Sequence, residues 1–191
     1  MKIEIREEPM TFLEEHGEVS IAFQVDRTLR ASLIRGGLGG VGLEERPIDE
    51  PYLKDYDAIR GEGPSRLASR FDLANWGLLG AHREGTRVGG AVLAFDTDGV
   101  SMLEGRRDLA VLWDLRVQPE HRRGQVGRAL FAAAESWAKA RHCVQLVVET
   151  QNVNVAASRF YAAMGCELRA LDRFAYPDLP DEVQLLWAKT L

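Results

Sequence analysis

The stretch from Leu109 to Arg141 constrains the fold more than any other part of the sequence. Its first part, Leu109–Val117, is apolar and rich in β-branched and aromatic residues, which favours a strand buried in a sheet. After Pro119 and a short polar turn, apolar residues recur at the spacing of one helix face, at Val126, Leu130, Ala134 and Trp137. A strand, a glycine-bearing turn and a helix in this order indicate an α/β protein.

The first turn of this helix predicts a binding site for a phosphate-bearing ligand. Backbone N–H groups at a helix N-terminus lack partners and carry the positive end of the helix dipole. Gly124 and Gly127 leave room for a pyrophosphate beside the backbone, and charged contacts can come from Arg122, Arg123 and Arg128. The sequence has neither GxxxxGK[ST] nor a GxGxxG that opens a βαβ unit, so the two other common phosphate loops do not fit.

The same stretch resembles the acetyl-coenzyme A loop of the GNAT N-acetyltransferase superfamily, in which a strand ending L-x-V precedes [Q/R]-x-x-G-x-[G/A] and a helix. The strand end is matched by Leu115-Arg116-Val117, and the loop by Arg122-Arg123-Gly124-Gln125-Val126-Gly127. Gln125 stands where the pattern has glycine, and Gly124 stands one place early. We therefore expect a different local backbone, with the Gln125 side chain against the pyrophosphate.

A second motif downstream supports the resemblance. Val144–Thr150 predicts another buried strand, and the following segment matches N-x-x-A-x-x-F-Y-x-x-x-G-F through Asn154, Ala157, Phe160, Tyr161 and Gly165, with Cys166 in place of the last aromatic residue. Together the two motifs identify the sequence as a member of the superfamily from about Trp76 onward. The segment Glu149–Gln151 and the run Tyr52–Tyr56 are similar to streptothricin acetyltransferases.

The resemblance implies a mixed, mostly antiparallel sheet with splayed central strands, flanked by helices. The length of 191 residues fits a single domain, residues 1–191. The resemblance also implies that acetyl-CoA is the cofactor and that its pantetheine pairs with Leu115–Val117, where a strand bulge can stabilise an oxyanion. Asn154, with Ala157, would contact the pantetheine arm, and Tyr161 would protonate the departing thiolate. The alternatives are a helix cap for Asn154 and a core position for Tyr161.

The remaining elements follow from periodicity and turn residues. A short strand is predicted at Lys2–Arg6 and helical turns at Thr11–His16. A long strand is predicted over Glu18–Leu33, with a helix as the alternative for its second half. The later elements are a turn or mobile loop over Arg35–Gly42, a hairpin of Asn75–Arg83 and Val88–Phe95, a helix over Val153–Met164, and closing strands at Cys166–Tyr176 and Glu182–Thr190. This order is consistent with an α/β sandwich on one mixed sheet.

An amine substrate needs a proton acceptor, because a lysine-type amine with a pKa of about 10.4 costs about 4.6 kcal/mol to deprotonate at pH 7. Strand alternation places Asp114 on one face with Leu112 and Arg116, and Trp113 on the other face. In the next strand Glu149 shares a face with Val147. Asp114 and Glu149 are therefore candidate bases. The alternatives are a structural pair of Asp114 with Arg116 and a hydrogen bond of Glu149 to backbone.

Pro47–Gly63 concentrates acidic residues and tyrosines. One interpretation is a solvated loop. In the other, Tyr52, Asp55 and Tyr56 bind a cationic amine, because negative charge and aromatic faces both attract ammonium groups. Acids near the C-terminus would extend this negative entrance, at Asp172, Asp178, Asp181 and Glu182.

Composition narrows the class of protein. The net charge of −5 disfavours a nucleic-acid binder, and the first thirty residues contain neither a signal-peptide pattern nor a membrane span. Cys143 and Cys166 lack metal-site spacing, so a cytoplasmic protein without a metal is expected. The sequence predicts an N-acetyltransferase that moves an acetyl group from acetyl-CoA to a small cationic amine. Peptide or protein N-terminal acetylation and an acyl-CoA-binding regulatory module remain alternatives, and a homodimer is left open.

Overall fold

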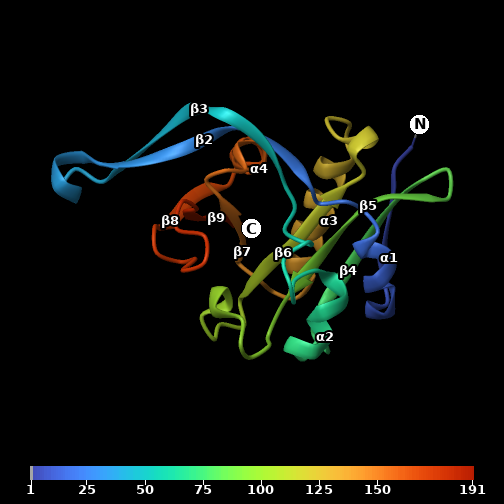
Figure 1. Cartoon of the computed structure of the whole chain (residues 1–191). Coiled ribbons are helices and arrows are strands. Elements are labelled where there is room, and N and C mark those ends of the chain that lie inside the picture. The colour runs from blue at the N-terminus through green and yellow to red at the C-terminus, as the bar shows by residue number, and fades with distance from the viewer. Residues whose placement is uncertain (1) are drawn as a thin grey trace. The chain divides into compact units, whose positions relative to one another are not determined.

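The computed structural model describes residues 2–191 (Figure 1). The chain divides into two compact units. Unit 1 contains Met1–Ile21, Asp55–Val148 and Lys189–Leu191, and unit 2 contains Ala22–Lys54 and Glu149–Ala188. Two strands, β7 (Gln145–Gln151) and β9 (Gln184–Thr190), contribute residues to both units. Within residues 2–191 no helix is both long and apolar enough to span a membrane.

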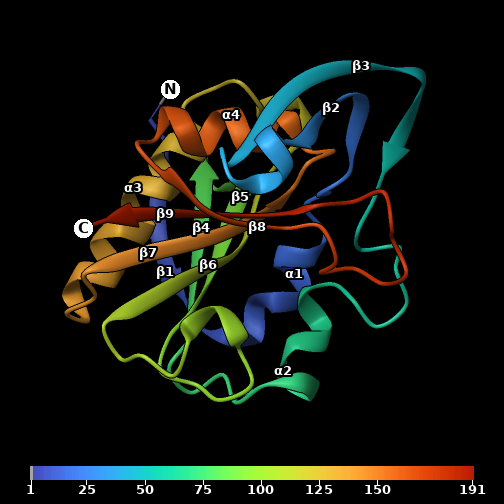
Figure 2. The same ribbon diagram turned by 90° about the vertical axis from the view of Figure 1, so that its left-hand side faces the viewer.

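Unit 1 is built on a mixed sheet whose described strands lie in the order β1-β4-β5-β6-β7 (Figure 2). Neighbouring strands are antiparallel except β6 and β7, which are parallel. The strands are β1 (Glu4–Glu8), β4 (Gly77–Arg83), β5 (Thr86–Ala94) and β6 (Leu109–Val117). The α-helices are α1 (Leu13–Gly17), α2 (Leu67–Arg70) and α3 (Val126–Ala140). Short 3-10 turns lie at Met10–Phe12, Pro64–Arg66, Ser101–Leu103 and Pro119–His121.

Two adjacent glycines of β5 show that helices cover both faces of this sheet. A Cβ atom on Gly89 would lie 3.3 Å from side-chain atoms of the α3 residues Val126 and Leu130. A Cβ atom on Gly90 would lie 2.4 Å from Nδ1 of His16, a residue of α1. Since successive strand residues point to opposite faces, α3 packs on one face and α1 on the other. The predicted apolar face of α3 is confirmed by four buried residues, Val126, Leu130, Ala134 and Trp137.

Unit 2 contains a long antiparallel ribbon, shown in blue to cyan in Figure 1. Its strands β2 (Phe23–Leu33) and β3 (Val41–Lys54) are joined by a turn that includes Ile34–Gly37. The unit also contains α4 (Val155–Ala163), β8 (Glu167–Asp172), most of β9 and the end of β7. β8 and β9 are antiparallel, and the N–H group just past β7, on Asn152, donates to the carbonyl of Val183 at 3.0 Å.

Most predicted elements are confirmed with shifted ends. The predicted hairpin corresponds to β4 and β5, and the predicted turn over Arg35–Gly42 is the tip of the ribbon. The solvated-loop interpretation of Pro47–Gly63 is wrong up to Lys54, because those residues complete the 14-residue strand β3. Pro47 and Pro51 are tolerated there because β3 pairs with β2 alone in the described sheets, which leaves its other edge free.

The pairing of the two parallel strands ends halfway along β6. Leu109–Leu112 pair with Gln145–Val148, whereas β6 itself continues to Val117. On its other edge β6 pairs with β5 as far as Val117. Among the described residues of unit 1, the segment Trp113–Val117 therefore has a strand on one side only. This separation matches the predicted splay of the central strands.

Candidate active site

The open segment of β6 begins with a β-bulge. Val92 of β5 is opposite Asp114, whereas the next residue, Leu93, is opposite Leu112, so Trp113 is an extra residue in β6. A bulge leaves its extra residue out of the ladder and redirects its backbone groups. The predicted alternation, with Trp113 and Asp114 on opposite faces, therefore does not hold through this point.

Trp113 belongs to a cluster of three aromatic rings in unit 1. Its ring centroid lies 5.2 Å from that of Phe71 in an edge-on arrangement and 5.4 Å from that of Trp76. Phe71 and Trp76 stack on each other at 5.4 Å. These contacts hold the bulge in a fixed position at the start of the open edge.

The turn after β6 leads directly into the N-terminus of α3. Arg123 has a left-handed backbone conformation (φ 59°), whereas Gln125 has right-handed helical backbone angles (φ −66°, ψ −2°). No side chain caps the first turn of α3. A Cβ atom on Gly124 would lie 3.1 Å from the carbonyl oxygen of His121, so this position has little room for a side chain. Because Gln125 is helical, it does not need the backbone freedom of the glycine that the motif has there.

The predicted phosphate-binding arginines divide into two kinds. Arg122 folds back on the chain, where its Nε donates to the carbonyl of Val117 at 2.9 Å and its Nη2 to the carbonyl of Ser20 at 2.7 Å. These bonds fasten the loop to the end of β6. Arg123 and Arg128 are exposed beside the first turn of α3. Together with the uncapped backbone of Val126 and Gly127, they form the part of the predicted loop that can receive an anion.

Arg116 lies on the open edge, but its side chain is buried and fully occupied. Its Nε donates to Asp114 at 3.0 Å, and its Nη2 also contacts Asp114. Its two terminal nitrogens donate to Asp57 at 2.7 and 3.3 Å, and Nη1 also donates to the carbonyl of Val19 at 3.0 Å. A guanidinium has five N–H groups, and each is used here. Arg116 can therefore serve a ligand only through its backbone.

These contacts favour the structural alternative for Asp114. Its carboxylate is held by Arg116, and Nε2 of the buried His16 lies 3.4 Å from its Oδ1. Burial alone would raise the pKa of Asp114, but the nearby His16 ring and the Arg116 guanidinium hold that pKa well below its usual range. Such a carboxylate is a weak proton acceptor. Sequence patterns did not identify His16 or Asp57 as partners, because these contacts join distant parts of the chain.

Glu149, in unit 2, has a different environment. Its Oε1 accepts from the Tyr176 hydroxyl at 2.6 Å and from Nε2 of Gln151 at 3.2 Å, and its Oε2 accepts from Nε2 of Gln184 at 2.6 Å. All three donors are neutral side-chain groups rather than the backbone groups of the alternative interpretation. Across residues 2–191 no cationic side chain forms an ion pair with Glu149. Burial and the charge of Glu149 raise the pKa of Tyr176, so its hydroxyl stays protonated.

Asn154 and Tyr161 lie in or beside α4. The Asn154 Oδ1 accepts from the N–H of Ala157 at 3.1 Å, so Asn154 caps the helix as the alternative interpretation had it. A contact of Asn154 and Ala157 with pantetheine remains a prediction. Asn152, two residues before this cap, is buried, and its side chain accepts from the N–H of Val183 at 2.8 Å. Tyr161 is buried, with its ring edge-on to Phe160 at 5.2 Å.

The predicted acceptor-binding residues are distributed over both units. In unit 2 Tyr52 is exposed on β3, and partial burial and the charges of Glu182 and Asp181 raise its pKa. In unit 1 Asp55 is exposed and accepts from the N–H of Asp57 at 3.1 Å, and Tyr56 is half-buried. Asp57 itself pairs with Arg116, so the acidic run is not uniformly available to a substrate.

Comparison with known proteins places these features in context. Residues 46–166 match the Acetyltransferase (GNAT) family. The chain is 35% identical over 151 residues to streptothricin acetyltransferase A of Bacillus subtilis (strain 168). This match covers 75% of this chain and 76% of that protein. It is 26% identical over 143 residues to streptothricin acetyltransferase of Streptomyces lavendulae, covering 75% of this chain and 71% of that protein.

Solved structures share the fold over the whole chain. A nourseothricin acetyltransferase superimposes with a TM-score of 0.77 at 24% identity, covering 100% of this chain and 99% of its own. A Bacillus anthracis str. Ames protein in complex with acetyl coenzyme A gives a TM-score of 0.76 at 24% identity, covering 100% of both chains. At this level of identity the two structures support the fold.

Proposed function

The chain belongs to the acetyltransferase (GNAT) family, and from this premise we propose that it moves an acetyl group from acetyl-CoA to a primary amine of a small cationic molecule. The observation that carries the proposal is the open edge Trp113–Val117, which the turn 118–125 connects to the uncapped N-terminus of α3. An extended ligand with amide groups can pair with a free strand edge, and a pyrophosphate suits a helix N-terminus.

The described residues fit acetyl-CoA. The backbone of Leu115–Val117 would pair with the pantetheine amides, and the first turn of α3 with Arg123 and Arg128 would hold the pyrophosphate. Acetyl-CoA supplies an acetyl thioester, which an amine can attack directly. A backbone N–H redirected by the bulge at Trp113 would stabilise the negative charge on the carbonyl oxygen. No nucleophilic side chain is required in this scheme.

Glu149 is the stronger candidate to take the proton from the amine. It carries a negative charge held only by neutral donors, whereas Asp114 is neutralised by Arg116. A carboxylate without a cationic partner attracts an ammonium group and can accept its proton, directly or through water. In this scheme Asp114 and Arg116 hold the shape of β6.

Tyr161 is proposed to protonate the departing thiolate. Tyr161→Phe should leave the affinity for coenzyme A nearly unchanged and lower kcat by about 10²–10⁴-fold, because the hydroxyl acts mainly as the sulfur leaves. Steady-state kinetics together with calorimetric binding of coenzyme A separate the two quantities. Wild-type kcat in this variant would show that water or another group protonates the sulfur.

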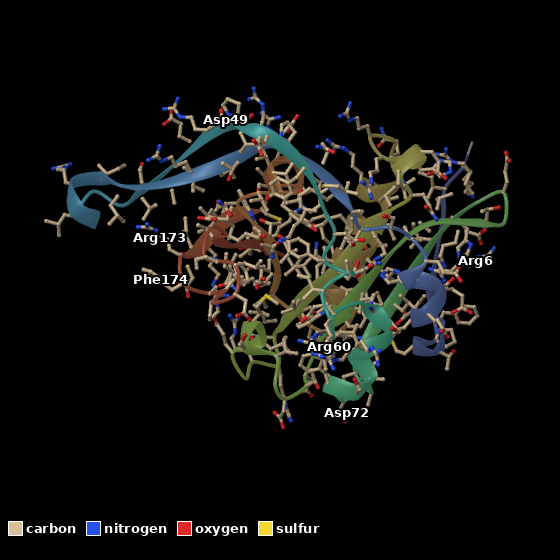
Figure 3. All side chains as sticks on the ribbon, in the orientation of Figure 1. Arg6, Asp49, Arg60, Asp72, Arg173 and Phe174 are labelled. Atoms are coloured by element: carbon tan, nitrogen blue, oxygen red, sulfur yellow. The ribbon has the colours of Figure 1, made fainter. Side chains whose placement is uncertain are left out.

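The acceptor is proposed to be cationic, as streptothricin-type antibiotics with a β-lysine amine are. The support is that Asp49, Tyr52 and Asp55 are each exposed, together with the names of the relatives (Figure 3 labels Asp49). A peptide N-terminus remains the second candidate within the family. An acyl-CoA-binding module is the third, and turnover of any amine would exclude it.

Turnover of an amine panel at increasing salt tests this acceptor class. Attraction between exposed charges is screened over about 8 Å at physiological ionic strength, so KM should rise with salt while kcat changes little. Asp49→Asn with Asp55→Asn should raise KM at low salt, whereas Asp72→Asn, an exposed acid elsewhere (Figure 3), should not. A KM that is indifferent to both changes would point to a neutral or peptide acceptor.

The residues proposed for the reaction belong to both units. We therefore also propose that residues 1–191 act as a single acetyltransferase domain, and that the enzyme works in the cytoplasm, where acetyl-CoA is available. Partial proteolysis tests the first point. Cleavage that separates an active fragment from the remainder would contradict a single functional domain.

A further inference from the structure

Glu149 has one hydrogen-bonding position left. A carboxylate offers about four lone-pair sites, two on each oxygen. Both sites on Oε1 are taken, by the Tyr176 hydroxyl and the Gln151 amide, whereas Oε2 accepts only from Gln184. Glu149 is half-buried, and the second lone pair of Oε2 has no hydrogen-bond partner among the described residues.

Its donors also fix the carboxylate in orientation. Tyr176 at 2.6 Å and Gln184 at 2.6 Å bond different oxygens, so the carboxylate cannot rotate without breaking one of these bonds. Gln151 donates to the Tyr176 hydroxyl oxygen at 3.1 Å as well as to Glu149, which positions the tyrosine itself. The hydroxyl donates to Glu149 and stays protonated, so it acts as a fixed donor.

The local charges favour one additional cation. The other nearby carboxylate, Glu182, contributes to the raised pKa of Tyr176 but is paired with Lys54 in a buried contact. Glu149 therefore retains a negative charge that no described cation offsets. Its three donors stabilise this charge without neutralising it. A ligand that brings one ammonium group to Oε2 would complete the site.

We propose that Tyr176 and Gln184 are positioning residues that aim Oε2 of Glu149 at the reacting ammonium group of the acceptor. The inference rests on the proposed function and adds the atom that accepts the proton. An N–H bond of the ammonium breaks and an O–H bond forms on Oε2. The freed nitrogen lone pair then forms a C–N bond to the thioester carbon, whose C–S bond breaks as coenzyme A leaves as a thiolate that takes a proton from Tyr161. Oε1 takes no part in the transfer, because Tyr176 and Gln151 occupy it.

A double-mutant cycle tests the role of Tyr176. The probes are acetyl-CoA and 1,5-diaminopentane, and the variants are Tyr176→Phe, Glu149→Gln and their combination. Loss of a hydrogen bond to a charged group costs about 1.5–3 kcal/mol, so Tyr176→Phe should lower kcat/KM about ten- to a hundredfold with coenzyme A affinity unchanged. In the Glu149→Gln background the same change should have little further effect, since Tyr176 acts through that carboxylate.

Two controls separate this role from a structural one. Phe174→Leu alters an exposed side chain of the same β8–β9 loop (Figure 3) and should leave kcat/KM unchanged. Gln184→Leu should reproduce the loss seen with Tyr176→Phe. If Tyr176→Phe lowers activity equally in both backgrounds, or not at all, the positioning role is overturned while the acetyltransferase function stands. A wild-type chain that binds no coenzyme A would instead overturn the proposed function and this inference with it.

Discussion

Arg116→Leu is expected to lower the free energy of unfolding by about 3–5 kcal/mol, because it leaves the carboxylates of Asp114 and Asp57 without their cation. Arg116 is 2% exposed, and it is the partner of both Asp114 and Asp57. A loss of this size is a large fraction of the stability of an ordinary domain. Urea unfolding followed by circular dichroism measures it.

A second variant keeps this prediction testable. Arg116→Leu with Asp114→Leu removes the buried carboxylate together with its partner, so it should recover part of the lost stability. The variant with only Asp114→Leu should be less stable than wild type, because Arg116 then keeps Asp57 as its one acidic partner. If Arg116→Leu alone unfolds at the wild-type urea concentration, the contacts drawn for Arg116 are wrong.

The acid dependence of stability has a definite direction. The pKa of Asp114 is lower in the folded chain than the value of 3.8 expected when it is unfolded. Its pairing therefore stabilises the fold at neutral pH, and this contribution declines only as the pH falls below about 4 toward the folded pKa. The Asp114→Leu variant should lose less stability than wild type over that acidic range.

Glu149→Gln is expected to lower kcat by about 10²–10⁴-fold, the usual contribution of a general base. Glutamine keeps the size of the side chain but removes its charge and its ability to take a proton. The affinity for coenzyme A should stay near that of wild type, because the cofactor contacts proposed above lie elsewhere. Stopped-flow or steady-state kinetics with a diamine acceptor, next to calorimetric binding, distinguish the two effects.

Asp114→Asn is the matched comparison for Glu149→Gln. Both changes remove one carboxylate, but Asp114 pairs with Arg116 and Glu149 has only neutral donors. Asp114→Asn should therefore reduce thermal stability and, below its melting temperature, retain most of the wild-type kcat. The opposite pattern, with an active Glu149→Gln and an inactive but folded Asp114→Asn, would transfer the role of base to Asp114.

Local sequence patterns were sufficient for the elements on either side of the proposed cofactor loop. The strand and helix over Leu109–Arg141 follow from apolar periodicity, which reflects packing against a sheet and therefore shows in the sequence. The same rule failed for β3. Its acidic residues and prolines are typical of a solvated loop, but a ribbon with one free edge accepts both.

The side-chain networks could not be predicted from local patterns. Arg116 contacts Asp57 and Val19, which are 59 and 97 residues away in the chain, and Glu149 contacts Tyr176 and Gln184 at separations of 27 and 35 residues. Such partners depend on the tertiary arrangement, which periodicity does not encode. The sequence named both candidate carboxylates, but only their surroundings distinguish a structural ion pair from a carboxylate with an open acceptor site.

The most direct test of the account is calorimetric titration of the wild-type chain with acetyl-CoA, because the central claim is that this ligand binds the open edge of β6 and the N-terminus of α3. The account predicts saturable binding that raises the melting temperature. At an acetyl-CoA concentration of a hundred times Kd, the free energy of unfolding should rise by about 2.7 kcal/mol. Gln125→Glu, which adds negative charge at the first turn of α3, should weaken binding, whereas Gln24→Glu on β2 should not. Absence of binding at millimolar acetyl-CoA, or equal affinity in the Gln125→Glu variant, would contradict the proposed site.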